Sequence, residues 1–197
     1  MNRPCRLLGA ALVALALLPA MPPARRATAL AAQELTLYAQ RGPGPGATAP
    51  DLVLPWATRD TVGSADFPFT LWKARGQLVV LHFTGSLADS AARALLRVLD
   101  AEREALPPGS VLAVVSTDGP AALREAARAA DVPILLLADT AQLAAGRYGA
   151  ARRKGENRSV LFLVGPDGSV AWRADNFAAR PAELAAFRRA AGRARGF

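Results

Sequence analysis

Short apolar runs alternate with amphipathic stretches along most of this chain. The apolar runs, rich in β-branched residues, predict buried strands over residues 52–54, 78–83, 111–116, 134–137 and 158–164. Between and after them, apolar residues recur at helical spacing and predict helices over residues 88–104, 120–130, 140–148 and 181–195. Gly165-Pro166-Asp167-Gly168 predicts a hairpin turn, with Asp167 in a structural role, and an antiparallel partner strand over 169–173. The pattern therefore predicts one α/β domain with a mixed central sheet flanked by helices.

The strand predicted over 78–83 leads almost directly into the helix predicted over 88–104. It stops at a Thr84-Gly85-Ser86 turn, and Ser86 precedes Asp89 by three residues, a spacing typical of a capping box. In α/β proteins, ligands and reactive groups commonly lie where the carboxyl end of a strand faces a helix N-terminus. This junction is therefore the first place to look for chemistry.

The first residues have the organisation of an export signal. A basic start precedes an apolar stretch over 7–18, and Ala29-Leu30-Ala31 fits an A-x-A cleavage pattern. The apolar stretch is short for a bilayer, so secretion is favoured, with an uncleaved signal anchor as the alternative. We predict a signal peptide over 1–31, a Gly/Pro-rich linker over 32–46 and a folded domain over 47–197. The predicted location is periplasmic or extracellular.

Cysteine usage limits the chemistry. The single cysteine, Cys5, lies before the apolar stretch, so removal of the signal leaves a chain without a thiol. Such a chain forms no disulfide, offers no thiolate and binds no metal through sulfur. With only one histidine, His82, we expect no metal site and no cofactor.

Basic residues dominate the charge balance. The formal charge is +8, and loss of the four arginines before Ala32 leaves +4. The remaining clusters, Arg152-Arg153-Lys154 and the arginines at 188, 189, 193 and 195, are interpreted as a solvated loop and helix face. No aromatic residues are interleaved with them, so no nucleic-acid partner is expected. Docking to anionic surfaces stays open as an alternative, and membrane contact is expected only through an uncleaved signal segment.

The order of elements and several short stretches resemble the peroxiredoxin-like branch of the thioredoxin superfamily, the alkyl hydroperoxide reductase/thiol-specific antioxidant or redoxin family. The similar stretches cover 46–51, 71–76, 79–83, 137–139, 148–149 and 162–168, within a span from Ala47 to Arg193. The resemblance implies a thioredoxin-like fold with a C-terminal β-hairpin and helix. It also implies antioxidant or thiol oxidoreductase activity.

The resemblance further implies where a reactive cysteine would stand, at the start of the helix after the 79–83 strand. The peroxiredoxin pattern assigns that cysteine to Ala91 and its supporting threonine to Ala88. A thioredoxin-like Cys-x-x-Cys pattern assigns cysteines to both Ala88 and Ala91. Arg158 falls near a strand arginine of the family. Ala88 and Ala91 are therefore interpreted as vacated redox positions.

No other nucleophile replaces the thiol convincingly. Ser90 has no positioned base, because His82 lies inside a buried strand, where a core histidine is the simpler interpretation. What is left is a helix start that could hold a small anion or a partner's carboxylate. The candidate anion-binding residues are Thr84, Gly85, Ser86, Asp89, Ser90 and Arg158.

Two functional hypotheses follow from these observations. In the first, an exported domain has lost thiol redox catalysis and acts as a binding or structural module for an unknown protein or a small anionic ligand. In the second, the chain keeps an antioxidant role by working with a partner's thiol.

Overall fold

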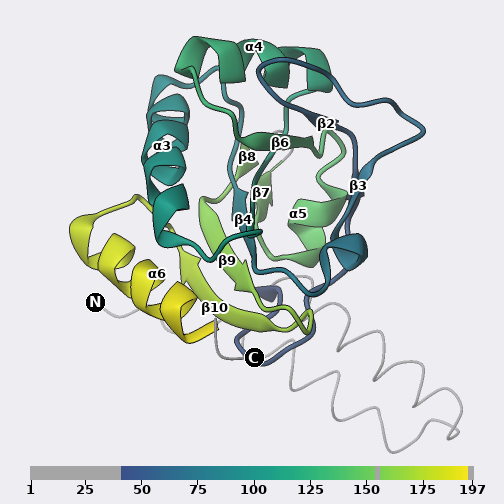
Figure 1. Ribbon diagram of the computed structural model, residues 1–197. Helices are drawn as coiled ribbons and strands as arrows, with labels where there is room; N and C mark the ends of the chain where they lie inside the picture. Colours follow the sequence, from purple (N-terminus) through teal and green to yellow (C-terminus); the bar gives the residue numbers. More distant parts are fainter. Residues whose placement is uncertain (1–40, 154–155, 195–197) are drawn as a thin grey trace, which may run out of the picture. The chain divides into compact units, whose positions relative to one another are not determined.

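The computed structural model describes residues 41–153 and 156–194 (Figure 1). The predicted signal peptide and residues 32–40 of the predicted linker lie outside the described residues. The remaining part of that linker, 41–46, packs on the folded domain. The Gly46 N–H donates to the Val170 carbonyl, and the Arg173 guanidinium donates to the carbonyls of Arg41 and Pro43. Gly42 has a φ of +65°, and a Cβ there would overlap the Tyr148 carbonyl, so glycine suits this close approach.

A six-stranded mixed sheet forms the centre of the described domain. Its strands, in spatial order, are β10 (Val170–Asp175), β9 (Val160–Val164), β4 (Val79–Phe83), β5 (Val111–Ser116), β6 (Leu135–Ala138) and β2 (Trp56–Ala57). Strands β4, β5 and β6 are parallel, whereas β9, β10 and β2 each pair antiparallel with a neighbour. The prediction of a mixed sheet ending in a β-hairpin is confirmed.

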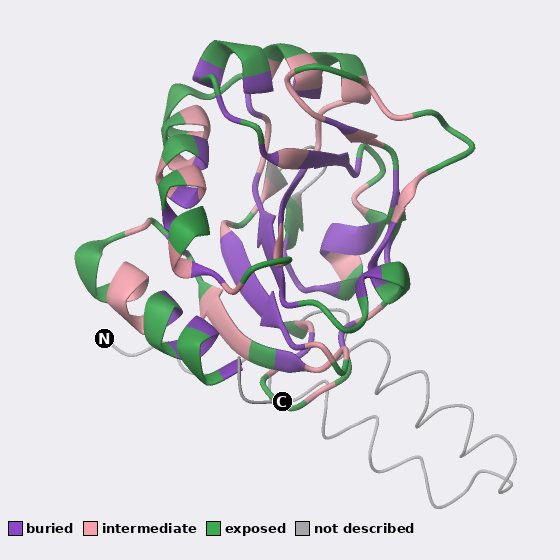
Figure 2. Cartoon of the chain, viewed as in Figure 1, coloured by how far each residue is buried: buried purple, intermediate pink, exposed green. Residues whose placement is uncertain are grey.

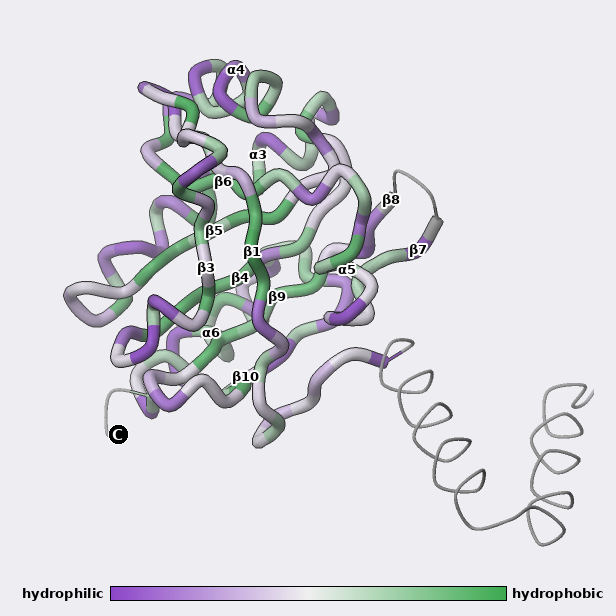
Figure 3. Tube along the Cα trace, turned by 90° about the vertical axis from the view of Figure 1, so that its right-hand side faces the viewer, coloured by the Kyte–Doolittle hydropathy of each residue, from purple (hydrophilic) through white to green (hydrophobic). Residues whose placement is uncertain are grey.

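Helices cover both faces of the sheet. On one face lie α3 (Ser90–Ala101), α4 (Pro120–Ala130) and α6 (Pro181–Arg193), whose apolar residues form one core cluster with alternate residues of the strands. The opposite face packs against α5 (Leu143–Arg147), the ribbon of β1 (Val53–Leu54) and β3 (Phe69–Thr70), and a 3-10 turn over Leu71–Ala74. Figure 2 shows the buried strands between these layers, and Figure 3 shows the same strands as the most hydrophobic part of the trace.

Strand β4 shows why the sheet is buried on both sides. All five of its residues are buried, with Val80 packed in the cluster under α3 and α4 and Leu81 in the cluster under α5. A strand covered on both faces carries a continuous apolar run, which is the pattern from which it was predicted. His82, the one polar residue of the run, points to the same face as Val80, because side chains alternate along a strand.

Predicted and observed boundaries differ mainly at helix ends. The helix predicted over 88–104 is α3 followed by a separate 3-10 turn, Glu102–Ala105, and the helix predicted over 140–148 shortens to α5. The ribbon of β7 (Ala151–Arg153) and β8 (Glu156–Asn157) was not predicted. Within the described residues, no helix is long and apolar enough to cross a membrane.

Candidate functional site

The junction between β4 and α3 is built by hydrogen bonds that come from other parts of the sheet. The Thr84 N–H donates to the Val115 carbonyl, so the chain is still tied to β5 as it leaves β4. Asp118 lies two residues after the end of β5, and its carboxylate accepts from the Leu87 N–H at 2.6 Å. The Ser116 hydroxyl donates to the Gly85 carbonyl at 2.9 Å. The loop is therefore held by the segment that follows β5.

Helix α3 is capped differently from the sequence prediction. Its N-cap is Asp89, whose Oδ1 accepts from the Ala91 N–H at 2.9 Å. Ser86 does not cap α3, because its Oγ accepts from the Ala88 N–H in the preceding loop. The predicted Ser86–Asp89 capping box is therefore wrong. Asp118 binds the loop before α3, and the N-cap of α4 is Gly119 without a side-chain cap.

Arginine and asparagine side chains satisfy the carbonyls of the same loop. Arg93, one turn into α3, donates from Nη1 to the carbonyls of Leu87 and Ala88 at 2.8 and 2.6 Å. The Asn157 amide donates to the Thr84 carbonyl at 2.9 Å. The carbonyls of Thr84, Gly85, Leu87 and Ala88 are thus paired within the protein, and side-chain oxygens already accept from several N–H groups of the loop.

The candidate anion-binding residues are brought together only in part. Thr84, Gly85, Ser86, Asp89 and Ser90 form one continuous turn, as the sequence dictates. Arg158, in contrast, is exposed, and its side chain makes no hydrogen bond or ion pair with a described residue. Its backbone N–H donates to the Ala150 carbonyl, beside the β7–β8 ribbon. The anion site itself stays a prediction.

A cleft of about 450 Å³ opens beside the first turns of α3. One wall is α3 itself, including Ala91 and Leu95, and the other is the segment Phe177 to Ala179 that joins β10 to α6. Thr84 and Ser159, at the ends of neighbouring strands, complete the lining. Ala91, the position that the resemblance assigns to the reactive cysteine, is exposed and lines this cleft. Ala88 lies in the loop before the helix.

His82 lies behind the cleft in the core. Its Nε2 is 2.9 Å from the Ser159 Oγ, and Ser159 in turn donates to the Phe177 carbonyl. Because the single hydroxyl proton of Ser159 serves that carbonyl, His82 must donate from Nε2, which leaves Nδ1 buried as an acceptor with no described partner. Burial lowers the pKa of His82 from 6.5 to about 4. A core histidine was predicted here, and His82 does lie in the core, where it contacts the Ser159 hydroxyl rather than Ser90 and keeps Nδ1 unsatisfied.

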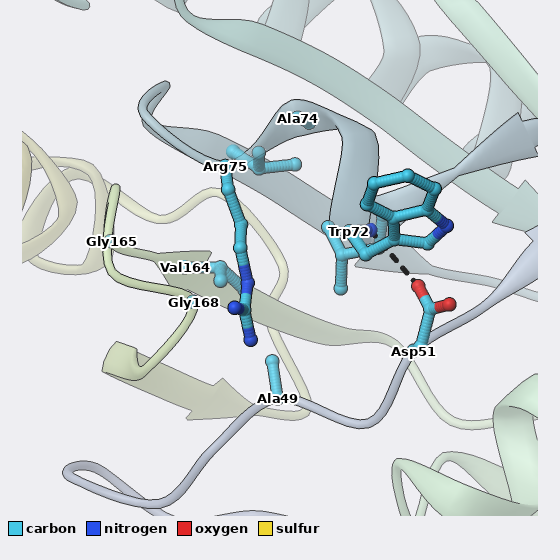
Figure 4. A pocket seen from close by; sticks show the side chains of 10 residues that line it. Ala49, Asp51, Trp72, Ala74, Arg75, Val164, Gly165 and Gly168 are labelled. Atoms are coloured by element: carbon cyan, nitrogen blue, oxygen red, sulfur yellow. Dashed lines mark hydrogen bonds between the residues drawn. The ribbon is translucent and has the colours of Figure 1, made fainter.

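A second pocket, drawn in Figure 4, is much smaller. It measures about 40 Å³ and lies between the 3-10 turn and the β9–β10 hairpin. The Asp51 carboxylate accepts from the Trp72 N–H at 3.0 Å, and the Arg75 side chain extends toward Gly168. Space for a few water molecules does not suit an organic ligand, so this pocket is a weaker candidate than the cleft beside α3.

The two arginine clusters lie on different elements. Arg152 is exposed on β7, whereas Arg188 lies on α6 and forms a two-pronged ion pair with Glu102, both N–O distances being 2.6 Å. Glu102 is only 6% exposed and holds the pKa of Arg188 above its usual value.

Asp167 has the structural role predicted for it, accepting from the Ser169 N–H and hydroxyl, and these hydrogen bonds lower the pKa of its carboxyl.

Comparison with known protein families identifies the family of this chain. Residues 45–173 match the AhpC/TSA family. The chain belongs to the AhpC/TSA family. No curated protein matches the sequence at a significant level. The fold of this AhpC/TSA chain is the thioredoxin-like one that the resemblance implied.

Solved structures of peroxiredoxins share the fold. Plasmodium vivax 2-Cys peroxiredoxin in its reduced form superposes with a TM-score of 0.66 at 17% identity, covering 78% of this chain and 99% of that one. Enterococcus faecalis AhpC has a TM-score of 0.66 at 15% identity, covering 76% and 93%. Mycobacterium tuberculosis peroxidoxin BcpB has a TM-score of 0.59 at 19% identity, covering 75% and 97%. At these identities the likeness concerns the fold.

Sequence reasoning missed the parts of the cleft that come from afar. Ser159 and the segment Phe177 to Ala179 carry no motif, and only the order of strands in the sheet brings them beside α3. Asp118 also holds the loop beside the cleft, through the Leu87 N–H. No local signal could have assigned it to a loop 31 residues earlier.

Proposed function

We propose that this AhpC/TSA chain is an exported domain that has lost thiol redox catalysis and acts as a binding module. The observation that carries the proposal is Ala91. It lies on the first turn of α3 and lines the cleft, but it has no reactive side chain, and the sequence contains no cysteine after Cys5. A peroxide or disulfide cannot be reduced by this domain without a thiol from elsewhere.

The hydrogen bonds of the junction support the same proposal. Asp118 and Arg93 hold the loop before α3 from both sides, so the local structure does not depend on a thiol at position 88 or 91. A scaffold maintained around a cleft of ligand size is what a binding protein requires. Export is proposed from the signal-like residues 1–31, whose apolar stretch and A-x-A pattern precede the domain.

A peroxidase assay tests the loss of catalysis. The full chain and its Cys5→Ser variant, which has no cysteine at all, are incubated with hydrogen peroxide or cumene hydroperoxide and dithiothreitol as reductant. We expect peroxide consumption at the rate of buffer with reductant for both proteins. Consumption above that rate by the Cys5→Ser variant would contradict the proposal, because a thiol-free chain would then be an enzyme.

The alternative in which a partner supplies the thiol is tested by addition. Candidate redox proteins encoded beside this chain are assayed with and without the Cys5→Ser variant. We expect their peroxide consumption to be unchanged. A rate that rises in proportion to the added variant would replace the binding-module proposal with that alternative.

A further inference from the structure

We infer that the cleft between α3 and the segment Phe177 to Ala179 binds a small organic amine with an apolar body. The inference deepens the proposed function, on which it rests, by naming the chemical class of the ligand. Four observations on the described residues support it: the size of the cleft, its apolar walls, its unpartnered polar atoms and the charge of its lining.

The size and walls of the cleft suit a short apolar chain or ring. Its volume of about 450 Å³ lies within the range of small-molecule sites. Ala91, Leu95 and Val98 of α3 face it from one side, and Phe177 faces it from the other. The small side chain of Ala91 takes up little of this space. An apolar ligand body of about six carbons could therefore be buried between these walls.

The polar side-chain atoms of the lining are mainly hydrogen-bond acceptors. Thr84 is 7% exposed and lines the cleft, yet its hydroxyl makes no hydrogen bond with a described residue. Ser159 has already committed its proton to the Phe177 carbonyl and its Oγ accepts from His82, so it presents only a lone pair. His82 Nδ1 is the one buried side-chain polar atom without a partner among the described residues, so the Thr84 hydroxyl is open to the cleft, where a ligand can pair with it.

The charged side chain of the cleft lining is an acid. Asp89 is the only charged side chain in its lining; Oδ1 is bound to the Ala91 N–H, while Oδ2 has no described partner. Two arginines of the segments that wall the cleft are engaged elsewhere, whereas Arg158, next to Ser159, has no ion-pair partner among the described residues but does not line the cleft. Arg93 donates to the carbonyls of Leu87 and Ala88, and Arg180 pairs with Glu183 at 2.8 Å. The site thus offers an acidic group within a chain whose overall charge is positive.

An ammonium group matches this inventory better than a carboxylate. It has three donors and no acceptor, whereas the lining has the Asp89 carboxylate, the Ser159 lone pair and a Thr84 hydroxyl that can also accept. A carboxylate would face Asp89 and find only the Thr84 hydroxyl as a side-chain donor. The structure therefore favours a cationic ligand here, in contrast to the anion predicted for the same helix start from the sequence.

Three probes of equal length separate these possibilities. Isothermal titration calorimetry of the full chain at pH 7 and physiological salt compares n-hexylamine, hexan-1-ol and sodium hexanoate. We expect hexylamine to bind about threefold more tightly than hexanol and about tenfold more tightly than hexanoate, as one partly exposed ion pair allows. The overall positive charge of the chain would favour the reverse order, so this order points to a local site.

Variants connect binding to the named residues. Asp89→Asn keeps an N-cap of equal quality but removes the charge, and we expect it to reduce hexylamine affinity to that of hexanol. Asp66→Asn removes an exposed acid that does not line the cleft and should leave all three affinities unchanged. Thr84→Val keeps the shape and should weaken hexylamine about threefold. Ala91→Leu, at an exposed helical position of the lining, should fill part of the cleft and weaken binding of all three probes.

The outcomes distinguish this inference from the proposed function. Tighter binding of hexanoate than of hexylamine would overturn the amine and support the anion predicted from the sequence. Equal effects of Asp89→Asn and Asp66→Asn, or no binding of any probe, would also overturn it. The binding experiments do not measure peroxide consumption. The peroxidase assay therefore decides separately whether catalysis is lost.

Discussion

Two junctions between a parallel strand and a helix use an aspartate in different ways. After β6, Asp139 is 2% exposed, and its two oxygens accept from the N–H groups of Ala144 and Ala145 at the start of α5. After β4, Asp89 is exposed and uses one oxygen to cap α3 through Ala91. Both aspartates border a cleft, of about 380 and 450 Å³ respectively.

The difference shows that a cleft beside a helix start is not by itself a binding site. At the β6–α5 junction the acid is consumed by the protein's own backbone and its charge is unavailable to a ligand. At the β4–α3 junction a carboxylate oxygen and the Thr84 hydroxyl have no described partner. The unpartnered polar atoms, more than the volume, identify the second junction as the functional candidate.

The largest expected difference between the strands before these two junctions is in how acid affects stability. β4 contains His82, whereas β6, Leu135–Ala138, contains no titratable residue. The pKa of His82 is lowered to about 4 in the folded chain, against 6.5 when unfolded, so below pH 6.5 the unfolded state binds a proton that the folded state does not. Stability should fall as the pH drops from 6.5 to 4, by on the order of 3 kcal/mol, and this contribution should level off below pH 4.

Urea denaturation across this pH range measures the effect, with His82→Gln as the matched control. Glutamine can still donate to Ser159 but does not titrate, so the variant should lack this part of the pH dependence. Parallel pH profiles for the two proteins would contradict a buried, neutral His82.

Removing the buried carboxylate of Asp139 should lower the free energy of unfolding nearly as much as acid does. Asp139→Ala leaves two buried N–H groups of α5 without acceptors, and we expect the free energy of unfolding to fall by about 2 to 3 kcal/mol. Asp139→Asn retains an acceptor and should lose less. Chemical denaturation at pH 7 decides the point; an Asp139→Ala protein as stable as the parent would mean that α5 does not depend on this cap.

Removing the exposed aspartate should cost less. Asp89→Ala deletes one N-cap hydrogen bond, and we expect a loss of about 1 kcal/mol, with Asp89→Asn within a few tenths of the parent. The same denaturation experiment applies. If Asp89→Ala were as damaging as Asp139→Ala, the distinction between a structural junction and an available one would fail.

A cysteine introduced at position 91 should have the pKa of an unperturbed thiol. In Ala91→Cys the positive end of α3 would lower the thiol pKa, but the adjacent Asp89 carboxylate would raise it, so we expect alkylation by iodoacetamide to follow a pKa of about 8.5. The Cys5→Ser background isolates this thiol. An alkylation midpoint below pH 7 would reveal an activating environment that Asp89 does not cancel.

Local patterns predicted the strands well and the site only in outline. The strand Val111–Ser116 has the predicted bounds, because a strand buried on both faces is a continuous apolar run. Strand β2, Trp56–Ala57, escaped notice because two residues carry no periodicity. The Ser86–Asp89 spacing indicated a cap in the right place, but Asp118 binds Leu87 and only Asp89 caps the helix.

The sequence by itself determined that no cysteine follows Cys5, that strands and helices alternate, and that the chain resembles the peroxiredoxin-like family. These features are carried by residue identity and by spacing within one element. Only the tertiary structure decided which polar atoms at the β4–α3 junction are satisfied and what faces α3 across the cleft. Phe177 lies more than eighty residues from Ala91 in the chain, and its place depends on the position of β9 and β10 beside β4, which local periodicity does not encode.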